Sequence, residues 1–353
     1  MTKVLYYLPV DEKYIDQWEY YKVDKEMLNN NYDQVIICSN FYSFIKNVLK
    51  VDHVYAWWWH RSVIIITISR LFLKKVFVTG AIHINDLKQE NYYVKKNLIY
   101  KIAITLSLKF SSKSLFISNH QYKEISNHFK FKNFFILRSS LNKHSSSQLE
   151  KKIIDKKIYI EKQPDKKVII FSTIIWHLKS QYIRKGLFET LNAFERLYLE
   201  NPNLQFQYII AGKVGPDINY LKNYINNLRS KDFISIRLNI SNKEKEDLLF
   251  KSDYYVQPSH YEGFGNAVLE AMSNACVPIV SNKTSQPEVV GKSGIIVKDI
   301  SIDQIYNTLK YAYTINKKKY SDFLDACKNH INENFTFDIR CKNFKKVSFK
   351  YTQ

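Results

Sequence analysis

Short runs of β-branched and aromatic residues alternate with longer amphipathic stretches along the first half of the chain. Each short run has the length of a strand and is bounded by turn residues, which is typical of buried strands. The predicted strands span residues 3–9, 34–40, 53–59, 76–81, 114–118 and 134–139. The spacing of apolar residues between them predicts helices over residues 16–29, 61–73 and 91–110.

The same alternation begins again after residues 143–167, a polar and lysine-rich stretch that we interpret as the region linking two domains. The predicted strands of the second series span residues 168–172, 204–211, 233–238, 253–258 and 277–281. The predicted helices span residues 185–198, 218–228, 243–251, 266–274 and 302–314. A last helical stretch, residues 338–349, has no strand after it.

Two successive series of this kind predict an α/β protein with two Rossmann-like, doubly wound domains. We expect an N-terminal domain over residues 1–160, a C-terminal domain over residues 161–335 and a C-terminal helix over residues 336–353 that can pack back on the N-terminal domain. Ligands of such folds bind at the carboxyl ends of the strands. A cleft between two facing domains is therefore the expected site.

The net charge, the cysteines and the apolar runs of the chain indicate which classes of binding partner and which cellular location to expect. The net charge of +20 is spread over both halves, so it permits nucleic acid, an anionic membrane or a phosphorylated ligand. No RRM, OB or zinc signature supports nucleic acid. The four cysteines are scattered, without metal-ligand spacing, and we expect reduced thiols in a cytoplasmic protein. No secretory signal is visible, and the longest apolar run, residues 62–69, is too short to span a bilayer.

Glycine is rare and unevenly placed. Of the eight glycines, all but Gly80 lie between residues 186 and 294. In a chain so poor in glycine, those present mark positions where a side chain would not fit. We therefore expect a ligand to lie against the backbone of the C-terminal half.

The segment from Tyr261 to Glu270 carries the most specific chemistry. It follows a predicted strand, turns on Gly263 and Gly265, and continues as a helix. Such a turn lets backbone N–H groups approach a ligand, and the helix start favours anions. Carboxylates at the edges of the turn, from Glu262 and Glu270, suit hydroxyl groups. Phosphate and sugar hydroxyls together predict a nucleotide sugar.

This segment resembles the E-x7-E signature of the retaining GT-B glycosyltransferases of glycosyltransferase family 4, also called group 1. The resemblance covers most of the C-terminal half, in the family's order: Pro258-Ser259, Glu262 to Gly265, Glu270 to Met272, Pro278, Pro287 to Val290 and Gly294 to Val297. It implies that Glu262 approaches the donor sugar and that Glu270 holds the ribose hydroxyls. It also implies donor contacts from the turn itself, namely from Gly263, Phe264, Gly265 and Asn266.

A second motif, Arg184-Lys185-Gly186, lies at a predicted helix start and resembles the basic pair with which the family neutralises the leaving diphosphate. Fixed cations there would stabilise the charge that develops when the sugar–phosphate bond breaks. The alternative is a solvated basic first turn. The chain departs from the family in one respect, because Ser172-Thr173 stands where an arginine is common.

Further matches are weaker. Gly212 to Gly215 resembles the family's Gly-x-Gly turn, and the loop with Leu238 and Asn239 matches the one beside the base. His83, after a strand and Gly80, resembles the histidine that touches the donor sugar. No Asp-x-Asp motif occurs, so the resemblance implies no cofactor and no metal, with the nucleoside diphosphate sugar as donor substrate.

The N-terminal half holds two ambiguous segments. Trp57-Trp58-Trp59 can stack on sugar rings or meet a membrane, and core packing accounts for at least one of the three. Residues 95–110 are basic at their start and apolar at helical spacing, which fits an interfacial helix beside a lipid-linked acceptor and an ordinary core helix equally well.

We expect a hexosyltransferase-type enzyme (EC 2.4) that moves a sugar to a hydroxyl of a glycan or lipid-linked acceptor in bacterial surface polysaccharide synthesis. In this hypothesis Glu262 and His83 position the sugar, while Lys185 and Arg184 stabilise the diphosphate. The protein would be cytoplasmic, with peripheral contact at the inner face of an anionic membrane and without nucleic acid as partner. The alternative is a catalytically degenerate glycosyltransferase-like protein that binds a nucleotide sugar or a partner.

Overall fold

The structure is a computed structural model that describes residues 2–11, 14–15, 18–84, 93–163 and 168–349. The chain divides into two compact units. Unit 1 comprises residues 1–146 and 334–353, and unit 2 comprises residues 147–333. Each unit is described by itself. None of the helices in the described ranges is both long enough and apolar enough to cross a bilayer.

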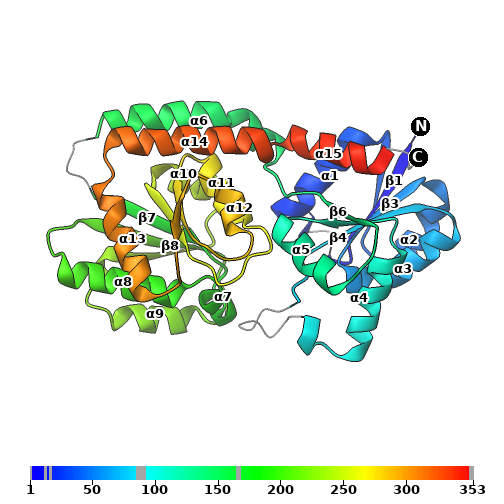
Figure 1. The fold of residues 1–353 in the computed structure, drawn as a ribbon, viewed down its shortest axis with the longest axis horizontal. Coiled ribbons are helices and arrows are strands. Elements are labelled where there is room, and N and C mark those ends of the chain that lie inside the picture. The colour runs from blue at the N-terminus through cyan, green and yellow to red at the C-terminus, as the bar shows by residue number, and fades with distance from the viewer. Residues whose placement is uncertain (1, 12–13, 16–17, 85–92, 164–167, 350–353) are drawn as a thin grey trace. The chain divides into compact units, whose positions relative to one another are not determined.

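Unit 1 is built on a six-stranded parallel sheet in the order β2-β1-β3-β4-β5-β6. Figure 1 shows strands of this sheet, with the helices of unit 1 around them. Its strands are β1 (Lys3–Tyr7), β2 (Gln34–Cys38), β3 (His53–Trp57), β4 (Lys75–Thr79), β5 (Lys113–Phe116) and β6 (Phe134–Ile136). Its helices are α1 (Glu19–Asn31), α2 (Phe41–Asn47), η2 (Val48–Lys50), α3 (Trp59–Leu71), η3 (Tyr93–Lys95), α4 (Leu98–Phe110), α5 (Asn119–His128) and α15 (Phe337–Phe349).

Alternation along the strands of unit 1 sends buried side chains to two helical layers. Leu5 packs in one core cluster with residues of α2 to α5. Its neighbour Tyr6 packs in the other, with residues of α1 and α15. Helix α15 is fixed there by a buried ion pair between Arg340 and Asp24, and Asp24 also accepts a hydrogen bond from the Tyr55 hydroxyl (2.8 Å).

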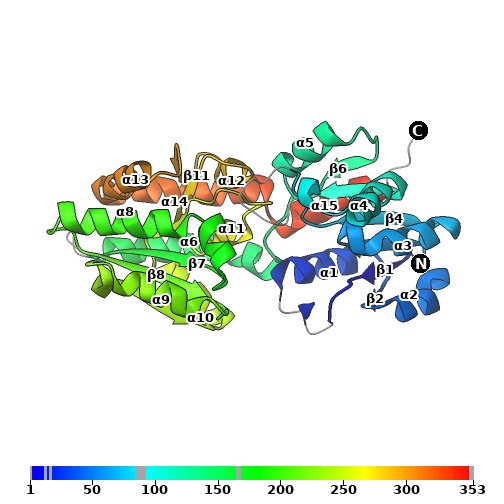
Figure 2. The ribbon, with the colours of Figure 1, turned by 90° about the horizontal axis from the view of Figure 1, so that it is seen from below.

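Unit 2 also has a six-stranded parallel sheet, in the order β12-β11-β10-β7-β8-β9. Its strands are β7 (Ile169–Ile174), β8 (Phe206–Gly212), β9 (Ile234–Leu238), β10 (Tyr254–Gln257), β11 (Val277–Ser281) and β12 (Ile295–Val297). Its helices are α7 (Lys179–Arg184), α8 (Leu187–Glu200), α9 (Ile218–Asn226), η4 (Lys231–Phe233), α10 (Asn242–Lys251), α11 (Asn266–Ser273), α12 (Gln286–Val290), α13 (Ile302–Thr314) and α14 (Lys317–Asn334). Helices α8 and α13 lie side by side over this sheet (Figure 2).

The prediction of two Rossmann-like α/β domains with parallel sheets is confirmed. The boundary between the two units, at residues 146 and 147, falls within the predicted linking region of residues 143–167. That region is not a loop, however, because α6 (Lys143–Glu161) occupies most of it. Leu149, Ile153, Lys156 and Ile160 form its buried stripe at helical spacing. The lysines on its other faces made the segment resemble a loop. Residues 164–167 lie outside the described residues.

Several predicted boundaries also shift. Strand β3 ends at Trp57 rather than at residue 59, because Trp59 already begins α3. Helix α4 begins at Leu98, capped by the side chain of Asn97, so the helix predicted from residue 91 is too long. Residues 91–92 of that prediction, and residues 16–17 of the first predicted helix, lie outside the described residues.

Candidate functional site

The carboxyl ends of β7 and β10 mark the centre of the candidate site. Along the sheet of unit 2 the strands run β9-β8-β7-β10-β11-β12, so the order reverses between β7 and β10. Connections leave these two strands toward opposite sides, which opens a crevice where ligands bind in open α/β sheets. Ile174 is the last residue of β7, and Gln257 is the last residue of β10.

The turn after β10 is held by the loop after β11. The Ser285 hydroxyl donates to the carbonyls of Glu262 (2.8 Å) and Phe264 (2.7 Å), and the Glu262 amide donates to the Thr284 hydroxyl (3.0 Å). Gly265 is the N-cap that precedes α11, with a φ of 109° that residues other than glycine rarely adopt. The Phe264 side chain is buried, so its predicted donor contact falls to its main chain.

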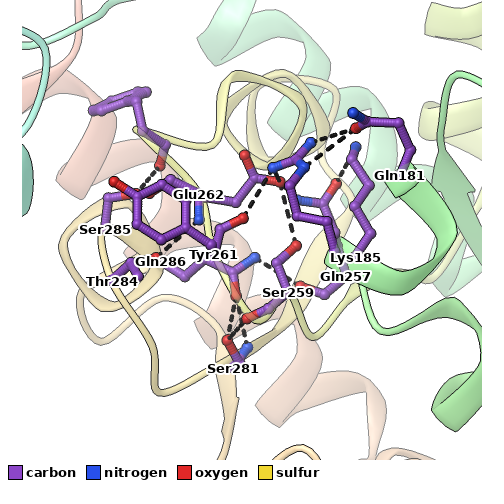
Figure 3. Close-up of polar contacts among 12 residues, drawn as sticks. Gln181, Lys185, Gln257, Ser259, Tyr261, Glu262, Ser281, Thr284, Ser285 and Gln286 are labelled. Atoms are coloured by element: carbon purple, nitrogen blue, oxygen red, sulfur yellow. Dashed lines mark hydrogen bonds and ion pairs between the residues drawn. The ribbon is translucent and has the colours of Figure 1, made fainter. Parts of the chain in front are cut away.

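Glu262 is the most constrained carboxylate of this turn. Its Oε1 atom forms an ion pair with Arg184 Nη1 at 2.8 Å. The same atom accepts hydrogen bonds from Gln257 Nε2 (2.9 Å) and from the Ser259 hydroxyl (3.2 Å), two residues labelled in Figure 3. Oε2 accepts no hydrogen bond from the described residues. Burial raises the pKa of the Glu262 carboxyl, but the positive charges of Arg184 and Lys185 outweigh it and hold the pKa below its usual value. Glu262 is therefore an oriented anion with one oxygen left for a ligand.

The sequence predicted that Arg184 and Lys185 lie at the start of a helix, but in the structure neither residue begins one. Arg184 ends α7, and Gly186 separates α7 from α8 with a φ of 65°. A Cβ atom at Gly186 would lie 2.4 Å from the Pro258 carbonyl oxygen, so glycine lets the two segments touch. The alternative of a solvated basic first turn is wrong, because the Arg184 side chain is 15% exposed and paired with Glu262.

Lys185 joins the ends of β7 and β10. Its ammonium donates to the Ile174 carbonyl and to Gln257 Oε1, both at 2.8 Å. Burial lowers the pKa of Lys185 to about 8, against the opposing charges of Glu262 and Glu270. The lysine therefore spans the switch point and is easier to deprotonate than an exposed lysine.

Glu270 lies further along α11, where the E-x7-E spacing places it. Its Oε2 atom pairs with the Lys245 ammonium of α10 at 2.8 Å. Both side chains are about a quarter exposed, at 23% for Glu270 and 24% for Lys245. Oε1 of Glu270 has no hydrogen-bond donor among the described residues.

The two loops with weaker motifs lie together. The Asn239 amide donates to the Gly212 carbonyl (2.8 Å), and Asn239 Oδ1 accepts from the Val214 amide (3.0 Å). A Cβ atom at Gly212 would lie 1.8 Å from the Ile175 carbonyl oxygen, so this glycine is required by close approach. Leu238 ends β9 directly before Asn239. The structure thus brings both loops to the carboxyl edge of the sheet.

His83 belongs to unit 1, four residues after the end of β4. Its carbonyl accepts a hydrogen bond from the Tyr93 amide at 2.7 Å. The structure does not relate it to the residues of unit 2, so its place at the donor sugar stays a prediction.

The switch point of unit 1, between β1 and β3, is lined by aromatic rings. Trp57 and Trp59 are buried, at 4% and 1% exposure, whereas Trp58 is partly exposed. Tyr20 and Tyr21 pack against Trp57, with ring centroids 5.1 and 5.0 Å away. Trp58 has a φ of 70°, a strained conformation for a bulky residue, and its indole N–H donates to the Tyr21 hydroxyl (2.7 Å).

The sequence did not reveal the role of the amides and hydroxyls that orient the charged groups. Ser259 lay within the matched Pro258-Ser259 pair without a role, and Gln181, Gln257, Thr284 and Ser285 were not predicted. Gln257 left one usable signal, because it is a polar residue within an otherwise apolar buried strand. The others come from segments without a distinctive pattern. Within the described ranges, no three His, Cys, Asp or Glu side chains are grouped so that they could hold a metal ion.

Comparison with known proteins agrees with this geometry. Residues 159–329 match the family model of the Glycosyl transferases group 1. The O-antigen chain mannosyltransferase B of Escherichia coli is 30% identical over 122 residues, which are 35% of this chain and 32% of that protein. The GDP-mannose:cellobiosyl-diphosphopolyprenol alpha-mannosyltransferase of Xanthomonas oryzae is 31% identical over 114 residues, which are 32% and 29% of the two chains. The match thus spans about a third of each relative.

Among solved structures, HepE from Anabaena, in complex with UDP and glucose, superposes with a TM-score of 0.71 at 13% identity. The superposition covers 98% of this chain and 99% of that one. At this identity the likeness establishes the fold, which is GT-B, with two Rossmann-like α/β domains.

Proposed function

We propose that this chain is a retaining glycosyltransferase that moves a hexose from a nucleoside diphosphate sugar to a hydroxyl of a glycan or lipid-linked acceptor. The observation that carries the proposal is that an oriented carboxylate, Glu262, and a partly buried ammonium, Lys185, lie together at the switch point of unit 2, joined through Gln257. The match to the Glycosyl transferases group 1 supports it. Both relatives are mannosyltransferases, which favours mannose as the sugar. The Xanthomonas relative uses GDP-mannose, which favours GDP as the nucleotide, and the Escherichia coli relative acts on the O-antigen chain, which favours a bacterial surface polysaccharide as the product.

Each charged group has a role in this proposal. Oε2 of Glu262 accepts a hydrogen bond from the donor sugar, and the free N–H of Lys185 points to the diphosphate. Oε1 of Glu270 accepts from the ribose hydroxyls. Arg184, already paired with Glu262, acts on the diphosphate less directly than Lys185, and His83 supports the sugar from unit 1.

The turn amides of Gly263, Phe264, Gly265 and Asn266 contact the sugar and the phosphates, and Leu238 and Asn239 lie beside the base. In the reaction, the bond from the anomeric carbon to the β-phosphate oxygen breaks while the acceptor oxygen bonds to the same face of that carbon. The acceptor proton passes to the departing diphosphate. Lys185 stabilises the charge that develops there without a metal ion.

A screen of nucleotide sugars tests this function. We expect GDP-mannose, or another nucleoside diphosphate hexose, to raise the melting temperature, because a ligand that binds only the folded state stabilises it. Lys185→Met should abolish most of this shift. Lys152→Met is the matched control, since Lys152 is a partly buried, ion-paired lysine of the same unit outside the site.

Transfer from the stabilising donor then separates enzyme from binder. Wild-type protein should form a glycosylated product from a polyprenyl-diphosphate glycan acceptor. A donor that binds with a Lys185-dependent shift, without transfer or hydrolysis, would instead support the degenerate, donor-binding alternative. Absence of a shift with every nucleotide sugar would contradict both.

We also propose that unit 1 makes peripheral contact with anionic lipid at the inner face of the cell membrane. Helices α2, α3 and α4 cover one face of the sheet, since their inward residues share a core cluster. Their outward side carries large exposed apolar side chains. These are Phe41, Tyr42, Ile45, Ile64, Leu71, Leu98, Ile99, Ile102, Leu106 and Phe110.

The positive charge of this surface favours anionic lipid as the partner that covers it. The charged residues of α2, α3 and α4 are all basic: Lys46, Arg61, Arg70, Lys101 and Lys109. On α4 the exposed residues recur four apart, at Leu98, Ile102, Leu106 and Phe110, while Ile104, Ser107 and Leu108 face the core. Exposed apolar residues on helices whose own charged residues are all basic suit the interface of an anionic bilayer.

Vesicle co-sedimentation tests this contact. The protein should pellet with vesicles of phosphatidylglycerol and phosphatidylcholine, and much less with phosphatidylcholine alone. Ile99→Asp/Ile102→Asp should lower binding about tenfold or more, because each charge would enter the interface. Ile154→Asp/Ile158→Asp on α6, whose residues are 50% and 49% exposed, is the matched control. Equal binding of both variants, or dimerisation through α4 without vesicle binding, would overturn the proposal.

A further inference from the structure

Gln257 lies between the two charged groups at the switch point of unit 2. Its side chain is almost fully buried, with 1% exposure. Its Oε1 atom accepts from Lys185 Nζ at 2.8 Å and from the Tyr255 hydroxyl at 2.7 Å. Its Nε2 atom donates to Glu262 Oε1 at 2.9 Å. One amide therefore contacts a cation at one end and an anion at the other (Figure 3).

The chemistry of the neighbours fixes the orientation of this amide. An ammonium can only donate hydrogen bonds, and an ionised carboxylate can only accept them. The carbonyl of Gln257 must therefore face Lys185, and its NH2 group must face Glu262. A flipped amide would oppose both charges.

The amide also leaves each charge with an unfilled position. Lys185 has three N–H groups, of which two are used, by the Ile174 carbonyl and by Gln257. Glu262 uses Oε1 for all of its side-chain contacts and keeps Oε2. A direct ion pair between these two groups would fill those positions and cancel the charges that a donor needs.

We propose that Gln257 is a positioning residue that holds Lys185 and Glu262 apart and aims both at the nucleotide sugar. This role rests on the proposed sugar transfer, since it concerns the same site. In this role Gln257, the last residue of β10, is a neutral side chain that lies between the cation Lys185 and the anion Glu262.

A buried glutamine can also serve stability alone, and Gln286 offers the matched control. Gln286 is fully buried. Its Nε2 atom donates to the main-chain carbonyl of Gln257 (2.7 Å), and its Oε1 atom accepts from the main-chain amide of Ser281 (2.9 Å). No contact joins it to Lys185 or to Glu262 in the described structure. Gln257→Met and Gln286→Met each replace one buried glutamine by a side chain of similar shape. Only Gln257→Met removes contacts with Lys185 and Glu262.

The experiment compares kcat, the donor KM and the melting temperature of both variants. We expect both to melt earlier, and only Gln257→Met to lose kcat, by about 10- to 100-fold, because small misplacements of reacting groups are costly. If kcat per folded molecule is the same in both variants, Gln257 is structural and the proposal fails. If the wild-type protein transfers no sugar, the proposed function itself fails.

A pH profile supplies a readout that stability does not move. Besides Gln257, three charged groups act on the pKa of Lys185: the carboxylates of Glu262 and Glu270 raise it, and the guanidinium of Arg184 lowers it. Loss of the acceptor in Gln257→Met should shift the alkaline limb of kcat to lower pH. Gln257→Glu places a carboxylate on Lys185 and should shift the same limb to higher pH. An alkaline limb that stays in place in both variants would overturn the positioning role.

Discussion

The two switch points of this molecule have the same architecture and opposite chemistry. In unit 2, the ends of β7 and β10 carry Lys185, Gln257 and Glu262, joined by short hydrogen bonds. In unit 1, the ends of β1 and β3 carry aromatic rings, with Trp58 held in a strained conformation. Both sheets have six parallel strands, so the segments that follow the strands at each switch point decide what each edge can bind.

The difference follows from what each edge must recognise in the proposed reaction. A nucleotide sugar brings charge and hydroxyls, which require fixed donors and acceptors. The sugar part of the acceptor is neutral, and its rings present apolar faces that suit aromatic side chains. The comparison therefore predicts that substitutions in the two units separate donor effects from acceptor effects.

The largest expected effect is that of Glu262→Gln. The variant keeps the shape of the side chain but removes the charge that pairs with Arg184. We expect kcat to fall about 10²- to 10³-fold, as when one aligned polar group is removed from a preorganised site. Steady-state transfer assays measure this. The control is Glu246→Gln, at a partly exposed glutamate of α10, which should keep wild-type activity. If Glu246→Gln lost as much activity as Glu262→Gln, the effect could not be assigned to the switch point of unit 2.

Arg340→Leu tests the core of unit 1 instead. The substitution leaves the fully buried carboxylate of Asp24 without its cation. We expect unit 1 to lose about 3 kcal/mol or more of unfolding free energy, as for other broken buried ion pairs. Urea unfolding followed by hydrogen exchange should place the loss in α1 and α15. Equal loss in unit 2 would show that the two units do not unfold independently.

The pH dependence belongs to unit 2. Lys185 has a pKa lowered to about 8, and its proton is needed at the diphosphate in the proposed reaction. Transfer should therefore fall as pH rises through about 8. Stability moves the other way, because the folded state binds fewer protons than the unfolded state between pH 8 and the ordinary lysine pKa of about 10.4. Parallel pH series of rate and melting temperature check both signs, and a flat rate up to pH 10 would contradict the assignment.

The smallest effect is expected at Trp58. Trp58→Leu removes the indole and its hydrogen bond to Tyr21. Loss of ring stacking should raise the acceptor KM about 3- to 10-fold and leave the donor KM unchanged. Kinetics with varied donor and varied acceptor separate the two constants. A change confined to the donor KM would reverse the roles of the two edges.

The sequence predicted more of the fold than of the site. Strand periodicity predicted all six strands of unit 1 and five of the six of unit 2, and β11 and helix α13 have the predicted bounds. It missed β12, which has only three residues. The prediction failed at α6, where a narrow buried stripe is surrounded by lysines, and at α7, a six-residue helix too short to show a period. Both are fixed by tertiary packing rather than by local pattern.

The charged residues of unit 2 were predictable because their motif has fixed spacing. Their partners were not, because hydrogen bonding across chain segments leaves no spacing to detect. Gln257 and Glu262 meet through a turn, but Lys185 reaches them from a segment some seventy residues earlier. Gly186 is the one sequence signal of that contact, since only glycine lets its backbone meet the Pro258 carbonyl.

Hydrogen–deuterium exchange with and without a nucleoside diphosphate tests the central claim, that the donor binds at the switch point of unit 2. GDP or UDP should slow exchange in peptides that contain residues 174–186 and 257–270. The matched peptides that end β1 and β3 in unit 1 should respond only when an acceptor glycan is added. Protection in unit 1 by the nucleotide alone, with no change in those two segments of unit 2, would contradict the account.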